Sequence, residues 1–120
     1  MKKYTFIALT LFLIVTSIST ASAQFLPTML RVTVLDEVGN IVEGATVTLY
    51  ASEEDYIEEK DPAFESVVSN KKGRAMFKKL DATQYFIHVE KGNLDNIGEG
   101  VSTSALKEGK VNLVNIIIRE

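Results

Sequence analysis

The fold is decided by residues 32–50, which read VTVLDEVGNIVEGATVTLY. Apolar and polar residues alternate along both halves, and a period of two rich in Val and Thr is typical of strands that bury one face. The buried face of the first strand would carry Leu30, Val32 and Val34, and that of the second Ala45, Val47 and Leu49. Gly39 and Asn40 supply the turn between them because both tolerate a positive φ, and Gly44 suggests a bulge. The stretch therefore predicts two paired strands against which the remaining chain packs.

The rest of the chain continues as short stretches separated by turn residues. Strands are predicted over residues 29–36, 45–51, 65–69, 74–77, 84–91, 101–106 and 110–119. Residues 70–73 form a turn and the glycine-rich residues 92–100 a loop. The inward side chains of the middle strands are expected to be Ala75, Phe77, Tyr85, Ile87 and Val89, with Leu80 filling the core between strands. This pattern indicates an all-β fold, an antiparallel Greek-key β-sandwich of about seven strands.

The N-terminus has the composition of a secretory signal peptide. Lys2 and Lys3 precede an apolar run at residues 6–15, and residues 21–23, ASA, form a small-residue cleavage site. The apolar run is shorter than the roughly 20 residues that a membrane helix needs, so cleavage before Gln24 is favoured over retention as an anchor. The predicted organisation is a signal peptide at 1–23, a lead-in at 24–28 and one domain at 29–120. Such a protein is exported to the periplasm or the cell exterior.

Composition narrows the class of protein and its partners. The chain has no cysteine, so it is predicted to be neither a lipoprotein nor a disulfide scaffold. Signal cleavage would leave 97 of the 120 residues, enough for one self-sufficient core. It would also remove Lys2 and Lys3, which leaves 11 of the 13 basic residues against 16 acidic ones, a net charge of −5. An acidic domain argues against nucleic acid as a partner, and the cleaved protein is not expected to be embedded in a membrane.

Two longer segments and one short strand carry a family resemblance. Residues 34–50, VLDEVGNIVEGATVTLY, resemble the opening of carboxypeptidase regulatory-like domains, V-x-D-x-x-G-x-P-[LV]-x-G-A-x-V-x-L, with Ile41 where that family often has proline. Residues 69–80, SNKKGRAMFKKL, resemble the family's T-D-x-x-G-x-F-x-F-x-x-L hairpin, and residues 85–89, YFIHV, match its Y-x-[LI]-x-V strand. The resemblance covers residues 31–92 and implies a transthyretin-like or Cna-B-like β-sandwich. Such domains accompany peptidases and outer-membrane receptors or occur alone as small secreted proteins, so the resemblance implies an accessory or binding module.

His88 is the only histidine in the chain. Its parity with Phe86 and Glu90 predicts that it lies on the solvent side of its strand. With no cysteine and no second histidine, a transition-metal site there would need carboxylates alone, so a surface histidine is the preferred interpretation. A Ser-His-Asp triad would have to use Ser102 or Ser104, and neither serine has a nucleophile elbow or an oxyanion loop beside it. The sequence therefore predicts no enzyme and no cofactor.

Residues 52–66 are strongly acidic and are predicted to form a loop with room for one helical turn before Pro62. The carboxylates that could offer oxygen ligands to calcium are Glu53, Glu54, Asp55, Glu58, Glu59, Asp61 and Glu65. The D-x-[DN]-x-[DN]-G spacing that wraps a chain around calcium is absent, so a solvated loop is favoured. A carbohydrate site would have to use Tyr50, Tyr56, Phe64 and Phe86, because the chain has no tryptophan.

Basic residues follow the acidic stretch, at Lys71, Lys72, Arg74, Lys78 and Lys79. The preferred interpretation is that the acidic and basic segments screen each other across one end of the sandwich or are simply solvated, since exposed pairs contribute little. The alternative is that they face a partner protein or the next copy of the chain in a head-to-tail contact.

The last predicted strand carries apolar residues on both faces. One face has Val114, Ile116 and Ile118, and the other has Val111, Leu113 and Ile117. A central strand covered on both sides explains this pattern. If the strand instead lies beside the first one, Met29, Leu35 and Ile117 form an exposed apolar patch that marks an interface. The sequence leaves both arrangements open.

These features predict a secreted, non-catalytic β-sandwich module that binds another envelope or secreted protein. The contact would use a sheet face, a strand edge or the charged end of the molecule. A carbohydrate- or calcium-binding module centred on residues 53–65 is the alternative.

Overall fold

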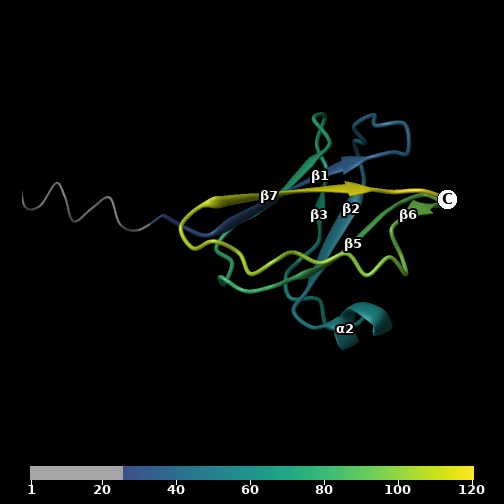
Figure 1. The fold of residues 1–120 in the computed structure, drawn as a ribbon. Helices are drawn as coiled ribbons and strands as arrows, with labels where there is room; N and C mark the ends of the chain where they lie inside the picture. Colours follow the sequence, from purple (N-terminus) through teal and green to yellow (C-terminus); the bar gives the residue numbers. More distant parts are fainter. Residues whose placement is uncertain (1–25) are drawn as a thin grey trace, which may run out of the picture.

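The computed structural model describes residues 26–120, which form two facing β-sheets and a short helix (Figure 1). The three-stranded sheet has the order β4-β1-β7, with β4 at Arg74–Phe77, β1 at Met29–Leu35 and β7 at Val111–Ile117. The four-stranded sheet has the order β3-β2-β5-β6, with β3 at Val67–Val68, β2 at Thr46–Tyr50, β5 at Phe86–Lys91 and β6 at Leu94–Asp95. The predicted all-β sandwich is confirmed. The predicted signal peptide lies outside the described residues, and within them no helix is long and apolar enough to cross a membrane.

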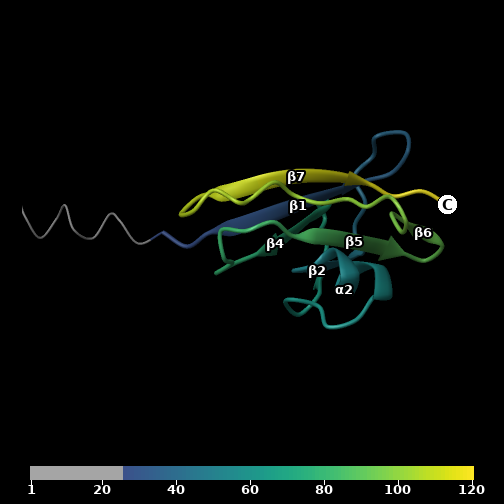
Figure 2. The ribbon, with the colours of Figure 1, turned by 60° about the horizontal axis from the view of Figure 1, so that its bottom comes forward.

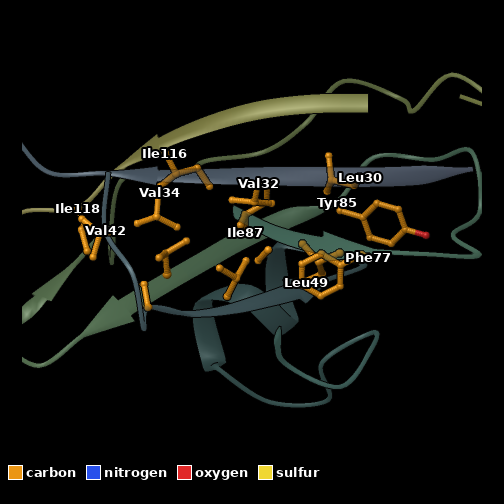
Figure 3. Close-up of a cluster of buried hydrophobic side chains, with 14 of the residues drawn as sticks. Leu30, Val32, Val34, Val42, Leu49, Phe77, Tyr85, Ile87, Ile116 and Ile118 are labelled. Atoms are coloured by element: carbon orange, nitrogen blue, oxygen red, sulfur yellow. The ribbon is translucent and has the colours of Figure 1, made fainter. Parts of the chain in front are cut away.

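One hydrophobic core fills the space between the two sheets (Figure 3). Leu30, Val32 and Val34 of β1 lie opposite Leu49 and Ile87 of the other sheet, and each of these side chains is at most 1% exposed. Burying one such side chain stabilises the fold by about 1.5–3 kcal/mol. The other predicted inward residues are also buried: Ala45, Val47, Ala75, Phe77, Leu80, Tyr85 and Val89. The period-two patterns therefore predicted the inner face of each main strand correctly.

The predicted turn at residues 70–73 connects the two sheets. Asn70 Oδ1 accepts hydrogen bonds from the backbone N–H groups of Lys72 and Arg74, at 2.9 and 3.1 Å. Gly73 has a φ of 73° and leaves no room for a side chain, because an added Cβ would lie 2.9 Å from Cβ of Ile41. Glycine is thus required where this hairpin approaches the β1–β2 connection.

The acidic stretch forms a helix, α2 (Glu53–Glu58), where the sequence predicts a loop with at most one helical turn. Ser52 caps it, since its Oγ accepts a hydrogen bond from the N–H of Asp55 at 3.2 Å. The carboxylates in the first turn also stabilise the helix, because negative charges near its N-terminus interact favourably with the helix dipole. The helix contacts β2 and β5 and lies against their outer face (Figure 2).

The C-terminal part of the chain differs from the prediction in three ways. Strand β7 is not a central strand but an edge strand that runs parallel to β1, which makes the sandwich not purely antiparallel. Residues 101–106 do not form a strand, and they pair with β5 only through an isolated bridge between Ser102 and Phe86. The short strand β6 lies within the predicted loop at residues 92–100.

Candidate functional site: two unlike outer faces

The outer face of the four-stranded sheet is covered by α2 through a cluster of aromatic rings. Tyr56 of the helix packs its ring 6.0 Å from that of Tyr50 and 5.9 Å from that of Phe86, between ring centroids. Tyr50 and Tyr56 are only 5% and 8% exposed, and this burial raises the pKa of both hydroxyls. Phe64 packs against Tyr85 in the same way, 5.9 Å between centroids. These rings contact one another, so the predicted candidates for sugar stacking do not form an exposed platform.

His88 is buried, which corrects the prediction that it faces solvent. It lies on the outer face of β5, as its parity requires, but α2 covers that face and leaves the residue 7% exposed. Its Nδ1 lies 3.4 Å from Oε1 of Glu59, and its Nε2 is buried without a hydrogen-bond partner in the described residues. Together with Tyr56, Ile57, Ile97 and Gly98, this pair lines a hollow of about 140 Å³.

The candidate calcium ligands lie in and just after α2. Glu53, Glu54, Glu58, Glu59, Asp61 and Glu65 are exposed, and Asp55 is half-buried. Within residues 26–120, no three His, Asp or Glu side chains come close enough together to hold a metal ion. The side chains fan outward around the helix because neighbouring positions on a helix point in different directions. Their arrangement gives a negatively charged surface rather than a chelating loop.

The contacts of the two serines considered for catalysis are with residues other than His88. Ser102 Oγ accepts a hydrogen bond from Nε2 of Gln84 at 3.2 Å, and Ser104 lines a groove beside β7. The carboxylate nearest to His88 is that of Glu59, which comes from the end of α2.

No element of residues 26–120 covers the outer face of the three-stranded sheet, which we call the bare face. Its outward side chains come from three strands and form rows across the sheet, with Arg31 between Met76 and Leu113, and Thr33 between Arg74 and Asn115. All of them are half-buried or exposed. The outward positions of the sheet are apolar, polar or basic and include no carboxylate: Met29, Arg31, Thr33, Leu35, Arg74, Met76, Val111, Leu113, Asn115 and Ile117. The alternative prediction that the last strand lies beside the first is therefore confirmed. The predicted patch is divided, because Leu35 and Ile117 are neighbours at one end of the sheet and Met29 lies beside Val111 at the other.

A basic hollow lies at the β4 side of this bare face. It has a volume of about 500 Å³ and is lined by Arg31, Asn70, Lys71, Lys72, Arg74 and Met76. The Nε of Arg31 is buried there without a hydrogen-bond partner in the described part of the chain. Of the five basic residues singled out in the sequence, Lys71, Lys72 and Arg74 line the hollow, while Lys78 and Lys79 follow the end of β4 and do not.

The acidic and basic segments do not screen each other, which corrects one half of the preferred interpretation and leaves the other half, that each segment is solvated. Figure 1 places the β3–β4 hairpin at the top and α2 at the bottom, on opposite sides of the sandwich. The ion pairs within residues 26–120 are Lys60–Glu58 and Arg119–Glu99, and neither these nor the contact of His88 with Glu59 joins the two segments. Each segment therefore presents its charge outward.

The free edge of β7 has unpaired backbone groups. The carbonyl of Lys110 accepts from Met29 N–H at 3.0 Å, and Ile118 N–H donates to the carbonyl of Leu35 at 2.9 Å, so even-numbered residues bond to β1. Successive residues of a strand direct their backbone groups to opposite sides. Residues 111, 113, 115 and 117 therefore direct theirs to the outer edge, where no other described strand pairs with them. A groove of about 420 Å³ runs beside the first half of this edge and is lined by Leu30, residues 102–104, 106–107 and 111–114.

The corresponding edge of β5 is closed. Oδ1 of Asn96 accepts from Val89 N–H at 2.8 Å, and its Nδ2 donates to the carbonyl of Ile87 at 2.9 Å. Strand β6 and residues 101–103 bond to the rest of that edge. Asn96 is 1% exposed, so this substitute for a neighbouring strand lies inside the protein. The sequence analysis missed Asn96, and only its position in a glycine-rich loop after a strand offered a signal.

The comparison with solved structures finds similar folds in two bacterial proteins. The TIE protein of Bacillus anthracis matches 77% of this chain at 16% identity with a TM-score of 0.54, and the match covers 16% of that protein. A D312A form of BcpA, the major pilin subunit of Bacillus cereus, matches 79% of this chain at 17% identity with a TM-score of 0.52, and the match covers 30% of that subunit. The chain thus spans less than a third of either protein, and the likeness is one of fold. No family model matches the chain, and neither does any curated protein.

Proposed function

We propose that this chain is an exported, non-catalytic interaction module, and that the open edge of β7 accepts an extended segment of a partner protein. The observation that carries the proposal is the edge itself. Natural sheets protect such edges with charges, proline, bulges or a covering segment. Residues 111–118 of this chain contain no charged residue and no proline, although Val111, Leu113 and Ile117 are 43%, 64% and 42% exposed.

The partner segment is an extended peptide with apolar side chains at alternate positions. Added beside β7, it satisfies the outward backbone groups of residues 111, 113, 115 and 117, and main-chain hydrogen bonds of this kind supply affinity in strand addition. Every second side chain of the segment points toward the core. These side chains enter the groove between β7 and residues 102–107, where Ser102, Ser104 and Lys107 favour polar side chains. The apolar side chains of the segment lie on the outer face, beside Val111 and Leu113.

Several observations support export and the narrower family. The N-terminal residues have the pattern of a signal peptide, and one similar sandwich belongs to a pilin subunit. We include the carboxypeptidase regulatory-like assignment in the proposal because its two motif segments fall on β1, β2 and the β3–β4 hairpin, as in the pattern of that family. Site-directed crosslinking in the native cell tests the function.

The test places a photoreactive benzoylphenylalanine at Leu113 in the full 120-residue chain, expressed in the cells that naturally produce it. We expect one discrete crosslinked protein, with the crosslink mapping to an extended segment of it. The matched control carries the same group at Val38, which is 80% exposed in the β1–β2 turn. Equal adducts at both positions, or none at Leu113, would overturn the proposal.

A second substitution tests whether the backbone edge carries the contact. Asn115→Pro removes an N–H that points outward and leaves the hydrogen bonds to β1 intact, because proline is tolerated on the free side of an edge strand. We expect it to abolish the Leu113 adduct, whereas Asn115→Val, which keeps the N–H, preserves it. An adduct that survives Asn115→Pro unchanged rules out strand addition.

A further inference from the structure

The two charged surfaces of this sandwich face away from each other and fit each other. The exposed side of α2 carries Ile57, which is 68% exposed, at its centre. Glu53 and Glu54 lie one turn before it on the same face, and Glu58 lies one turn after Glu54, so carboxylates border an apolar side chain. On the other side of the molecule, the basic hollow has Met76 as its apolar residue and four cationic side chains around it.

We propose that α2 of one copy of this chain docks into the basic hollow of the next copy. Ile57 would lie over Met76, and the surrounding carboxylates would pair with the lysines and arginines that line the hollow. Arginine suits such a contact because its planar guanidinium binds a carboxylate through two hydrogen bonds. Charge complementarity and a shared apolar centre identify the occupant as a second copy, since the same chain supplies both halves.

Neither half is neutralised within the described part of a single chain. Lys71, Lys72 and Arg74 have no ion pair there, and the one ion pair on the exposed side of α2 joins Glu58 to Lys60. Both residues of that pair are about half exposed, so it contributes little and can exchange. The negative net charge of the chain opposes self-association, but it is spread over the whole surface. At physiological salt, where charges more than about 8 Å apart are screened, contacts within the interface dominate.

The placement of the two surfaces determines the kind of assembly. An isologous dimer uses the same patch on both copies, whereas here each copy offers two different patches on opposite sides of the sandwich. A contact of this heterologous kind leaves a free helix at one end and a free hollow at the other. The assembly therefore grows beyond a dimer as the protein concentration rises.

Sedimentation velocity of protein purified from cells expressing the full 120-residue chain provides the test. We expect a weight-average mass that rises past that of a dimer with concentration at low salt and falls toward that of a monomer at high salt. A monomer at every concentration, a mass that stops at the dimer, or association that salt does not weaken would each overturn the proposal.

Charge reversal identifies the surfaces. Lys71→Glu/Arg74→Glu should weaken association by on the order of tenfold or more, because it places like charges in the contact. Glu54→Lys/Glu58→Lys should do the same. Mixing the two reversed proteins restores association, since each reversed surface then meets its complement. Failure of the mixture to associate, although both proteins give the circular dichroism spectrum of the unmodified protein, contradicts the docking.

Two matched controls complete the experiment. Lys78→Glu/Lys110→Glu makes the same change in net charge at exposed positions that line neither the basic hollow nor the groove beside β7, and we expect it to retain most of the association. Ile57→Ser should weaken association, whereas Val38→Ser, at a more exposed valine in the β1–β2 turn, should leave it unchanged. If the controls weaken association as much as the test variants do, net charge or general hydrophobicity drives it, and the proposed contact is wrong.

Discussion

Helix α2 lies over the outer face of the four-stranded sheet (Figure 2) and covers the outward side chains of Tyr50, Phe86 and His88, whereas no described element covers the outward side chains of the three-stranded sheet. Both sheets bury their inner face in the same core, so the difference concerns only what each presents outward. A six-residue helix is too short to be stable alone in water, and α2 persists because Tyr56 anchors it. The covered face therefore contributes to stability, and the bare face remains available for contact.

The edge of β5 in one sheet and the edge of β7 in the other also differ, because the first has hydrogen-bond partners and the second does not. The edge of β5 is closed by β6, by residues 101–103 and by the side chain of Asn96, while the edge of β7 is open. The residues that close the β5 edge form hydrogen bonds within the protein. No described residues form such bonds along the outer edge of β7. The comparison teaches that the four-stranded sheet has internal contacts on its outer face and at its β5 edge that the three-stranded sheet lacks, and three measurements test this difference.

The largest effect is expected at Tyr56. Tyr56→Ala removes the ring that joins α2 to Tyr50 and Phe86, and truncating a buried aromatic residue costs about 3–5 kcal/mol of unfolding free energy. Leu113→Ala on the bare face is the control, because that side chain is 64% exposed and substitutions at such positions usually change stability by less than about 0.5 kcal/mol. Equilibrium denaturation in urea measures both. Equal losses would mean that the two faces do not differ in their contribution to stability.

The inner faces of both sheets could be predicted from the sequence, and the outer faces could not. Period two identifies which side chains of a strand point together, as for Val32 and Val34, because alternation is a local property of the chain. The same parity placed His88 on the outer face correctly, but it carries no information on whether another element covers that face. Ser52 followed by Asp55 is a capping signal for α2. The sequence analysis predicted a loop there instead, because the stretch is so rich in carboxylates.

The edges were also beyond prediction, because the order of strands depends on contacts between distant segments. Strand β7 pairs with β1 across more than 80 residues, and its apolar residues on both faces fitted a central strand as well as a bare one. The closing role of Asn96 depends on where its loop folds back, 7 and 9 residues after the backbone groups that it binds. The basic hollow needed the same information, since Arg31 joins the hairpin lysines only through the pairing of β1 with β4.

The second effect concerns the edges. Asn96→Ala leaves the N–H of Val89 and the carbonyl of Ile87 without their partner inside the protein, and an unpaired buried polar group costs about 1–3 kcal/mol. We expect a loss of about 2–3 kcal/mol, measured by urea denaturation. Asn115→Ala removes the same side chain from the open edge of β7, where Asn115 is exposed, and should change stability by less than about 0.5 kcal/mol. A comparable loss at Asn115 would show that the edge of β7 is already closed in solution.

The smallest effect is a dependence of stability on alkaline pH. Burial raises the pKa of Tyr50, Tyr56 and Tyr85 above the ordinary value of 10.0. Above about pH 10 the unfolded chain loses these protons more readily than the folded one, so the stability present below that pH is lost as pH rises toward the folded pKa values. Each tyrosine contributes at most about 1.4 kcal/mol per pH unit, measured by urea denaturation at pH 8 to 11.

Tyr56→Phe isolates the part of this dependence that belongs to the covered face. The hydroxyl of Tyr56 is buried without a hydrogen-bond partner in the described residues, so its removal should leave stability at neutral pH unchanged or slightly higher. The backbone N–H groups of Gly100 and Val101 lie near enough to the hydroxyl to lower its pKa, but less than burial raises it. The variant should therefore lose less stability than the unmodified protein between pH 10 and 11. An unchanged alkaline slope would place the titrating hydroxyls at Tyr50 and Tyr85, and would leave Tyr56 of α2 without a detectable share in the slope.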